Sequence, residues 1–192
     1  MFYSYPTKYV KILLTKQVIF VKTISETSNS YLLFYNYFYN RLFIVMKTGY
    51  FNQLKNTEIP GVISISLMPS GFDFVKFEFK ALAPNWKLKE LFRKNKIDEF
   101  FFIQQYNNQL ELLNPKSTFD HLISLADGNE PILMTHGNKT KFCHRHLVAQ
   151  WFSDKLGLDI EEYETGKVVR KNGYMKKMDN PTLFQWNTYL NF

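Results

Sequence analysis

Residues 131–157, PILMTHGNKTKFCHRHLVAQWFSDKLG, predict a strand, a loop and a helix in direct succession. The short apolar run Ile132–Met134 is typical of a buried strand, and the polar stretch Thr135–Phe142 predicts a loop. A helix is expected from about Cys143, because apolar residues then recur at helical spacing. Those residues are Leu147, Val148, Trp151, Phe152 and Leu156. Gly157 is well placed to end this helix.

The residues upstream of this segment alternate between the same two patterns. The β-branched apolar run Gly61–Leu67 predicts a strand, which the turn residues after Met68 end. Three helices are expected next, at 86–94, at 98–113 and from Asn114 to near Gly128. In the third helix Asn114 is a favourable N-cap, and the proline that follows it is favourable at the first helical position.

Two further elements are expected after Gly157, a strand at 158–163 and a β-hairpin over 167–177 with Asn172-Gly173 at its centre. Strands that alternate with helices predict an α/β fold. The expected architecture is a small, mostly parallel sheet flanked by helices, a Rossmann-like three-layer arrangement.

Ligands of open α/β sheets bind beyond the carboxyl ends of the strands. Two loops leave such ends here, Met68–Phe74 and Thr135–Phe142, and in a parallel sheet they meet at one edge. The second loop leads into a helix N-terminus, where unpaired backbone N–H groups and a positive dipole attract anions. The sequence therefore predicts an anion site at this edge. Its expected ligand-binding residues are Arg145, Pro69, Ser70, Phe72, Thr135 and His136.

Cys143 and His144 are the candidate catalytic residues of that site. A thiol at a helix N-terminus beside an arginine has a lowered pKa, and its thiolate is a nucleophile. Arg145 can hold a phosphate or carboxylate through two parallel hydrogen bonds. A structural interpretation stays open, in which Cys143 is a small buried residue and Arg145 pairs with an acid of the fold such as Asp73.

Neither a metal nor a cofactor is expected. With one cysteine in the chain, a zinc site built on paired cysteines is excluded. Adjacent helical residues do not share a face, so we expect His144 to face inward and His146 to face outward. The four side chains His136, Cys143, His144 and His146 are therefore poorly placed to act together as tetrahedral ligands of a metal ion.

The charge of +7 divides unevenly along the 192 residues. Residues 1–45 carry five Lys and Arg against one acid, residues 46–164 carry 14 against 15, and residues 165–192 carry five against one. The central segment 46–164 is therefore the expected α/β domain, and both ends are basic. The single cysteine favours a reducing compartment, and we expect a cytoplasmic protein.

Residues 1–45 differ in composition from the rest, with no Ala, Gly, Asp, Trp, Cys or His. Phe, Tyr, Lys, Ile and Asn fill 23 of these 45 positions, as in translated AT-rich DNA. The leading interpretation is a mis-assigned or extraneous extension before Met46. Genuine extra elements remain open, as does a membrane role. However, Tyr31–Met46 is shorter than the roughly 20 apolar residues of a spanning helix, so no stable membrane insertion is expected.

Residues 165–192 form an expected basic hairpin and aromatic tail. Lysines and arginines there alternate with Tyr174, Trp186 and Tyr189. Basic side chains contact phosphates and aromatic rings stack on bases, so a non-catalytic nucleic-acid-binding module is the alternative function. A solvated hairpin with its aromatic residues docked on the domain explains the same pattern. The partner expected for the chain, if it has one, is an anionic small molecule or a nucleic acid.

Over about residues 46–163 the chain resembles the family called domain of unknown function 488. The matching segments are Val62–Ser66 with Pro69 and Phe72, Leu82–Pro84, Ile97–Tyr106 with Leu110, Pro115, and Phe142–Ala149. Cys-His-Arg at the start of a helix is that family's signature, and the resemblance implies an α/β domain without an established activity. The chain departs from the family pattern at Thr135, where relatives carry a cysteine, and at Gly137, where they carry an acid. A two-cysteine redox mechanism is therefore not expected.

Overall fold

The computed structural model describes residues 8–14, 17–23, 46–55 and 57–177. Chain contacts divide the protein into two units, Met1–Ile44 and Val45–Phe192. In the first, the strands β1 (Lys8–Leu14) and β2 (Gln17–Thr23) pair in an antiparallel hairpin. Within the described ranges no helix is long and apolar enough to cross a membrane. The membrane segment considered at 31–46 lies outside those ranges except for its last residue.

A five-stranded parallel sheet forms the centre of the second unit, which confirms the predicted α/β class. Its strands are β3 (Lys47–Tyr50), β4 (Val62–Ser64), β5 (Phe77–Glu78), β6 (Ile132–Thr135) and β7 (Glu161–Glu162). The order across the sheet is β5-β4-β6-β3-β7, so β6 lies between the first two strands of the domain. This order differs from the 3-2-1-4-5-6 arrangement of dinucleotide-binding sheets.

Four α-helices accompany the sheet in the part of the domain that the structure describes. They are α2 (Trp86–Arg93), α3 (Glu99–Glu111), α4 (Pro115–Leu125) and α5 (His144–Leu156). Each of the four begins and ends within a few residues of the bounds predicted for it. The expected cap of α4 is confirmed, because the Asn114 side chain accepts a hydrogen bond from the Ser117 amide. Gly157 ends α5 with a φ of 66°, a left-handed conformation in which glycine is favoured.

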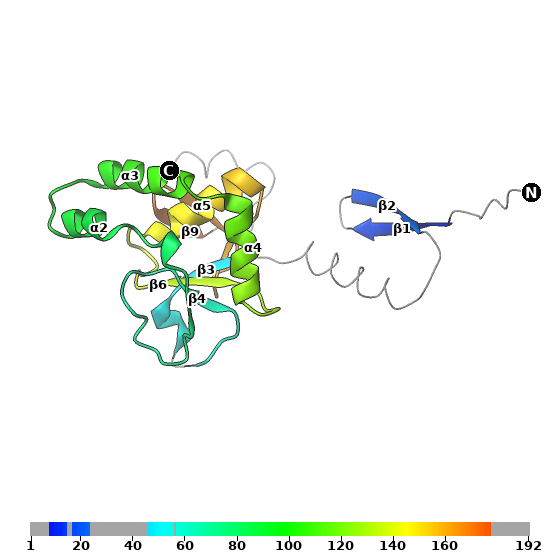
Figure 1. The fold of residues 1–192 in the computed structure, drawn as a ribbon, viewed down its shortest axis with the longest axis horizontal. Helices are drawn as coiled ribbons and strands as arrows, with labels where there is room; N and C mark the ends of the chain where they lie inside the picture. Colours follow the sequence, from blue (N-terminus) through cyan, green and yellow to red (C-terminus); the bar gives the residue numbers. More distant parts are fainter. Residues whose placement is uncertain (1–7, 15–16, 24–45, 56, 178–192) are drawn as a thin grey trace, which may run out of the picture. The chain divides into compact units, whose positions relative to one another are not determined.

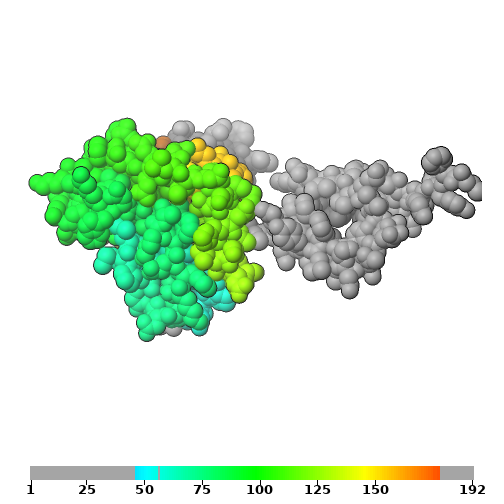
Figure 2. Space-filling view, viewed as in Figure 1, coloured from blue at the N-terminus to red at the C-terminus, as the bar shows by residue number. Residues whose placement is uncertain are grey.

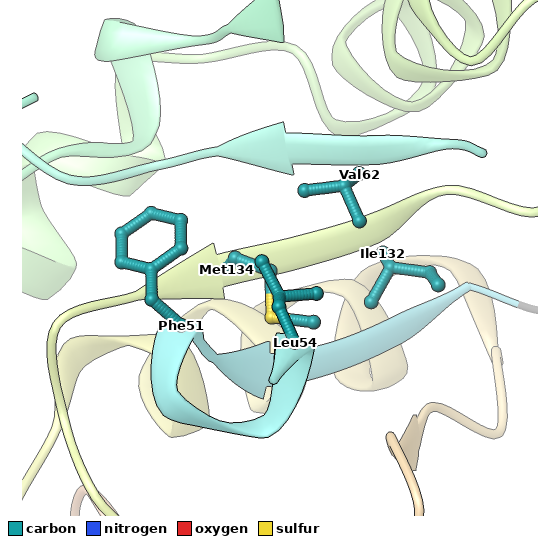
Figure 3. Packing of buried hydrophobic residues seen from close by; sticks show 5 residues of the cluster. All are labelled: Phe51, Leu54, Val62, Ile132 and Met134. Carbon is teal, nitrogen blue, oxygen red and sulfur yellow. The ribbon is translucent and has the colours of Figure 1, made fainter. Parts of the chain in front are cut away.

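The two faces of the sheet are covered by different elements, which gives the predicted three layers. Helix α5 packs on β3 and β6, with α3 and α4 beside it. In Figure 1, α3 and α5 lie above the sheet and α4 stands at its right-hand side. The 3-10 helix Phe51–Leu54 covers the opposite face together with the loop that follows β4. There Phe51 and Leu54 pack against Val62, Ile132 and Met134, whose side chains share one face of the strands (Figure 3).

A β-hairpin completes the described residues, and its strands are β8 (Val168–Lys171) and β9 (Tyr174–Lys177). Asn172 and Gly173 have φ values of 50° and 82°, which confirms the turn predicted from the Asn-Gly pair. The turn docks at the start of α5, because the Cys143 amide donates a 2.8 Å hydrogen bond to the Gly173 carbonyl oxygen. The hairpin therefore contributes backbone to the predicted site.

Strand lengths are where prediction and structure differ most. The strand expected at 158–163 is reduced to two residues in β7, and β3 and β5 were not expected. Both missed strands lack the apolar run that marks a strand in sequence, since β3 reads KTGY and β5 reads FE. In the space-filling view the green α2 and α3 segments lie at the upper left of the domain and the yellow-green α4 segment lies at its right (Figure 2).

Candidate functional site

The two predicted loops meet at the carboxyl ends of β4 and β6, as a parallel sheet requires. The His136 ring nitrogen Nε2 lies 2.7 Å from the Pro69 carbonyl oxygen. The His136 amide also donates a 3.3 Å hydrogen bond to Ser66 Oγ. These contacts join the end of the β6 strand to the loop after β4, beside the N-terminus of α5.

Cys143 occupies the N-cap position of α5 and is 6% exposed. Its Sγ lies 3.3 Å from Thr135 Oγ1, so the two side chains share a hydrogen bond. The His144 Nε2 donates to the Ile65 carbonyl oxygen at 2.9 Å, which leaves Nδ1 as the ring nitrogen available to the thiol. The β4 and β6 strand ends thereby orient both side chains.

The surroundings of Cys143 favour its thiolate. Burial by itself raises the pKa of a thiol, but the hydrogen bond and positive charge of His144 oppose it. The charge of Arg145 and the Thr135 hydroxyl act in the same direction, and together they lower the pKa of Cys143 to about 6. These surroundings therefore favour the thiolate more than those of an ordinary cysteine do.

Arg145 is fully buried and pairs with an acid of the fold. Its Nε donates to Glu162 Oε1 at 3.0 Å, and its Nη2 donates to the Asn138 carbonyl oxygen at 2.9 Å. The acid is Glu162 of β7 and not Asp73, the residue considered from the sequence. Asp73 is exposed in the loop after β4.

Glu162 is shared by a second arginine. Its Oε2 accepts 2.7 Å and 3.3 Å hydrogen bonds from Thr48 Oγ1 and Arg170 Nη2. Arg170 also donates to Thr48 Oγ1 and to the Ile160 carbonyl oxygen. Burial lowers the pKa of Arg170 to about 10, although the charge of Glu162 opposes the shift.

This buried cluster carries one positive charge in excess, because two guanidinium groups face one carboxylate. Two guanidinium nitrogens of the cluster, Arg145 Nη1 and Arg170 Nε, are buried and have no hydrogen-bond partner in the described structure. A Cβ placed on Gly137 would lie 2.6 Å from this Nη1 and 2.7 Å from Cys143 Sγ. The unpaired guanidinium nitrogen and the thiol sulfur therefore lie beside the same glycine.

The prediction that His146 faces outward is wrong, because the residue is fully buried. Neither of its ring nitrogens has a partner within the described ranges. Burial, followed by the charges of Arg145, Arg170 and His144, lowers the pKa of His146 to about 2. The hairpin is packed over this face of α5, so the first turn of the helix is enclosed on two sides.

The remaining predicted residues lie further along the strand ends. Ser70 Oγ accepts from the Phe72 amide and donates to the Phe72 carbonyl oxygen, both at 3.1 Å. The Phe72 ring packs on Phe51 at 6.2 Å, and the exposed His136 ring packs on Phe51 at 4.8 Å. The structure thus gathers Thr135, Cys143, His144 and Arg145 at one point. Pro69, Ser70 and Phe72 lie in the adjoining loop after β4, and His136 contacts that loop from the end of β6.

Among the described residues, no group of three or more His, Cys, Asp or Glu side chains could hold a metal ion. A hollow of about 350 Å³ lies elsewhere, between α3 and α5, and is lined by residues such as Asn107 and Trp151. None of the predicted site residues lines it, so the chemistry of Cys143 does not depend on that hollow.

The polar groups of the hairpin are largely engaged within the protein. Lys167 pairs with Asp159 at 2.6 Å, Arg170 pairs with Glu162, and the Tyr174 hydroxyl donates to Glu99. These contacts support a docked hairpin, and the nucleic-acid interpretation stays a prediction. Trp186 and Tyr189 lie outside the described residues.

Three residues of the site were not expected from the sequence, namely Thr48, Glu162 and Arg170. A signal for Glu162 existed, because it is two residues after the buried Ile160 and strand side chains alternate between faces. An acid on an inward strand face needs a partner. Thr48 and Arg170 had no comparable signal. Thr48 is 114 positions from Glu162 and Arg170 is 8 positions from it, and only packing brings the three side chains together.

Comparison with known proteins supports the resemblance stated above. The family model described as DUF488-N3a, active DUF488-N3 subclade, matches residues 55–156. No curated protein and no solved structure matches the chain.

Proposed function

The chain belongs to the DUF488-N3a family, and on that premise we propose that it binds an anionic ligand at the N-terminus of α5. The ligand is the phosphate or carboxylate group of a small molecule or nucleotide. Arg145 and the first backbone amides of α5 bind it, and Cys143 and His144 lie beside it.

The observation that carries this proposal is the buried, unpaired Arg145 Nη1. A buried donor without an acceptor costs free energy, and one on a charged group costs more than a neutral one. The excess positive charge of the Arg145, Arg170 and Glu162 cluster increases that cost. A bound anion supplies both the missing acceptor and the missing charge.

The helix itself provides further donors. Cys143 is the N-cap, and its side chain makes no capping hydrogen bond. Backbone N–H groups in the first turn of a helix have no intrahelical acceptor, and the helix dipole favours negative charge at that end. An anion near Nη1 would therefore also be stabilised by the amides of the first turn.

Gly137 stands beside Arg145 Nη1 at the position where the resemblance implies an acidic residue in relatives. A Cβ at this position would overlap Arg145 Nη1, because it would lie only 2.6 Å from it, so the backbone of Gly137 packs directly beside this nitrogen. In this chain no side chain covers Nη1 from position 137. We infer that a ligand anion takes the place of the missing carboxylate.

Thermal unfolding in phosphate tests the proposal, with chloride at equal ionic strength as the reference. Phosphate should raise the unfolding midpoint of the wild-type chain, because a ligand that binds only the folded state stabilises it by RT ln(1 + [L]/Kd). Arg145→Lys keeps the charge but removes Nη1, and should abolish the increment. Arg93→Lys, a surface arginine paired with Glu90, is the matched control and should keep it. Equal midpoints in phosphate and chloride for the wild type would contradict the proposal.

A nucleophilic role for Cys143 is the second candidate function, and the thiol's low pKa supports it. The rate of alkylation by iodoacetamide should rise with pH around a midpoint near 6. His144→Gln should move that midpoint upward, because the imidazolium charge is lost. A wild-type midpoint at or above about 8.5 would assign Cys143 a structural role.

A further inference from the structure

We propose that the tip of the β8–β9 hairpin, residues 172–174, is a gate over the start of α5, which opens to admit a ligand while the base of the hairpin stays in place. This inference goes beyond the proposed function, because it concerns access to the site and needs no particular ligand. Cys143 is 6% exposed and Arg145 is fully buried. Neither an anion nor a thiol reagent reaches these side chains unless a covering segment moves.

The hairpin is not part of the central sheet. Its two strands pair only with each other in the part of the chain that the structure describes. A two-stranded hairpin is marginally stable by itself in water. The closed position of the hairpin therefore depends on individual contacts with the rest of the domain, and these contacts differ between its base and its tip.

The base of the hairpin is held by charged groups. The Arg170 side chain of β8 is 6% exposed and donates to the Glu162 carboxylate and to the Thr48 hydroxyl. Lys167 pairs with Asp159 at 2.6 Å. Pulling Arg170 away would leave buried charges without partners, which is among the most costly changes in a folded protein. We therefore expect the base to stay in place.

The tip of the hairpin is held by weaker contacts. The Gly173 carbonyl oxygen accepts a 2.8 Å hydrogen bond from the Cys143 amide, and the Tyr174 hydroxyl donates to Glu99 Oε1 at 2.6 Å. The rings of Tyr174 and Phe142 pack with their centroids 5.8 Å apart. A single hydrogen bond of this kind contributes much less than a buried ion pair. The tip can therefore separate from α5 at a lower cost than the base.

Opening of the tip would release the Cys143 amide from the Gly173 carbonyl oxygen, at the helix end where the anion is proposed to bind. The loop 136–141 is another segment beside the thiol, and its Asn138 carbonyl oxygen accepts from the buried Arg145. Movement of that loop alone would uncover the thiol but leave the hydrogen bond between Cys143 and Gly173 intact. The state of this hydrogen bond therefore distinguishes the two movements.

Alkylation of Cys143 by iodoacetamide tests the gate in the full chain, at one neutral pH and without added anion. Tyr174→Phe removes the hydroxyl that binds Glu99 and should raise the alkylation rate about threefold to tenfold, as the loss of one hydrogen bond predicts. Tyr163→Phe is the matched control. It makes the same change on a half-buried tyrosine whose hydroxyl has no hydrogen bond among the described residues, and it should leave the rate unchanged.

Hydrogen exchange, measured by NMR, identifies the segment that moves. In Tyr174→Phe the Cys143 amide should exchange faster by the same factor as the alkylation, whereas the amide of Val148, in the middle of α5, should be unaffected. Equal acceleration at both amides would assign the alkylation to unfolding of the whole domain. Faster alkylation with unchanged exchange at Cys143 would assign it to the loop 136–141.

Either of these results, like an unchanged alkylation rate in Tyr174→Phe, would overturn the gate. All of these measurements are made without an anion, so they leave the proposed function to be decided by the phosphate experiment. Faster alkylation together with faster exchange at Cys143 alone is the result that the gate requires.

Discussion

Replacing Glu162 with glutamine should be among the most destabilising single changes in the domain. The substitution keeps the shape of the side chain but removes the charge that holds two buried arginines. In the wild type the carboxylate accepts from Arg145 Nε at 3.0 Å, from Thr48 Oγ1 at 2.7 Å and from Arg170 Nη2 at 3.3 Å. A glutamine amide has an NH2 group in place of one carboxylate oxygen. At least one of these three contacts would then bring two hydrogen-bond donors together.

The expected loss is about 3–5 kcal/mol, the range for removing one partner of a buried ion pair. The upper half applies here, because Glu162 and Arg145 are both fully buried and two guanidinium groups are left without an acid. Arg145→Met should cost less, since Glu162 keeps Arg170 and Thr48. The double variant should lose less than the sum of the two single losses, with a coupling of about 1–3 kcal/mol.

Urea unfolding at neutral pH, followed by circular dichroism, measures these differences. The control is Glu111→Gln, which removes an acid paired with Lys155 on the surface and should change the free energy of unfolding by no more than about 0.5 kcal/mol. A loss below about 1 kcal/mol for Glu162→Gln, or strict additivity with Arg145→Met, would refute the buried cluster and the excess charge inferred from it.

Three further perturbations test other parts of the structure. The pKa of Cys143 is about 6 in the folded chain and about 8.5 in the unfolded one. The stabilisation that the Cys143 thiolate contributes to the folded state is therefore complete above the unfolded pKa and is lost as pH falls through 6. The free energy of unfolding of wild type minus that of Cys143→Ala should therefore fall by up to about 3 kcal/mol between about pH 9 and pH 6 in urea titrations; a pH-independent difference would contradict the lowered pKa. Gly173→Ala should lower the thermal midpoint more than Gly157→Ala, because both have positive φ but only the first Cβ would overlap the Phe142 ring, and equal losses would disprove the close packing of the hairpin turn. A chain starting at Met46 should have the same thermal midpoint as the full chain, because the two units Met1–Ile44 and Val45–Phe192 are each held together by their own contacts. An insoluble product would show that the first unit is required.

Local signals in the sequence predicted much of the fold correctly. The Asn114-Pro115 start of α4, the Gly157 end of α5 and the Asn172-Gly173 turn each depend on the conformational preferences of a few adjacent residues. The strand at Ile132 and the helix that begins after Cys143 were recognisable from their apolar spacing. The short strands β3 and β5 were not, because they are defined by hydrogen bonds to neighbours and not by their own composition.

The sequence by itself determined the α/β class, the order of the helices and the place of Cys143 at a helix start, since all three follow from local patterns. Only the tertiary structure decided which groups surround that cysteine. Glu162 comes to Arg145 from 17 positions away and to Thr48 from 114, and His146 is buried instead of exposed because the hairpin packs over it. Such contacts depend on how separate elements pack against one another, and a donor that this packing leaves without an acceptor, like Arg145 Nη1, is visible only once every neighbour is in place.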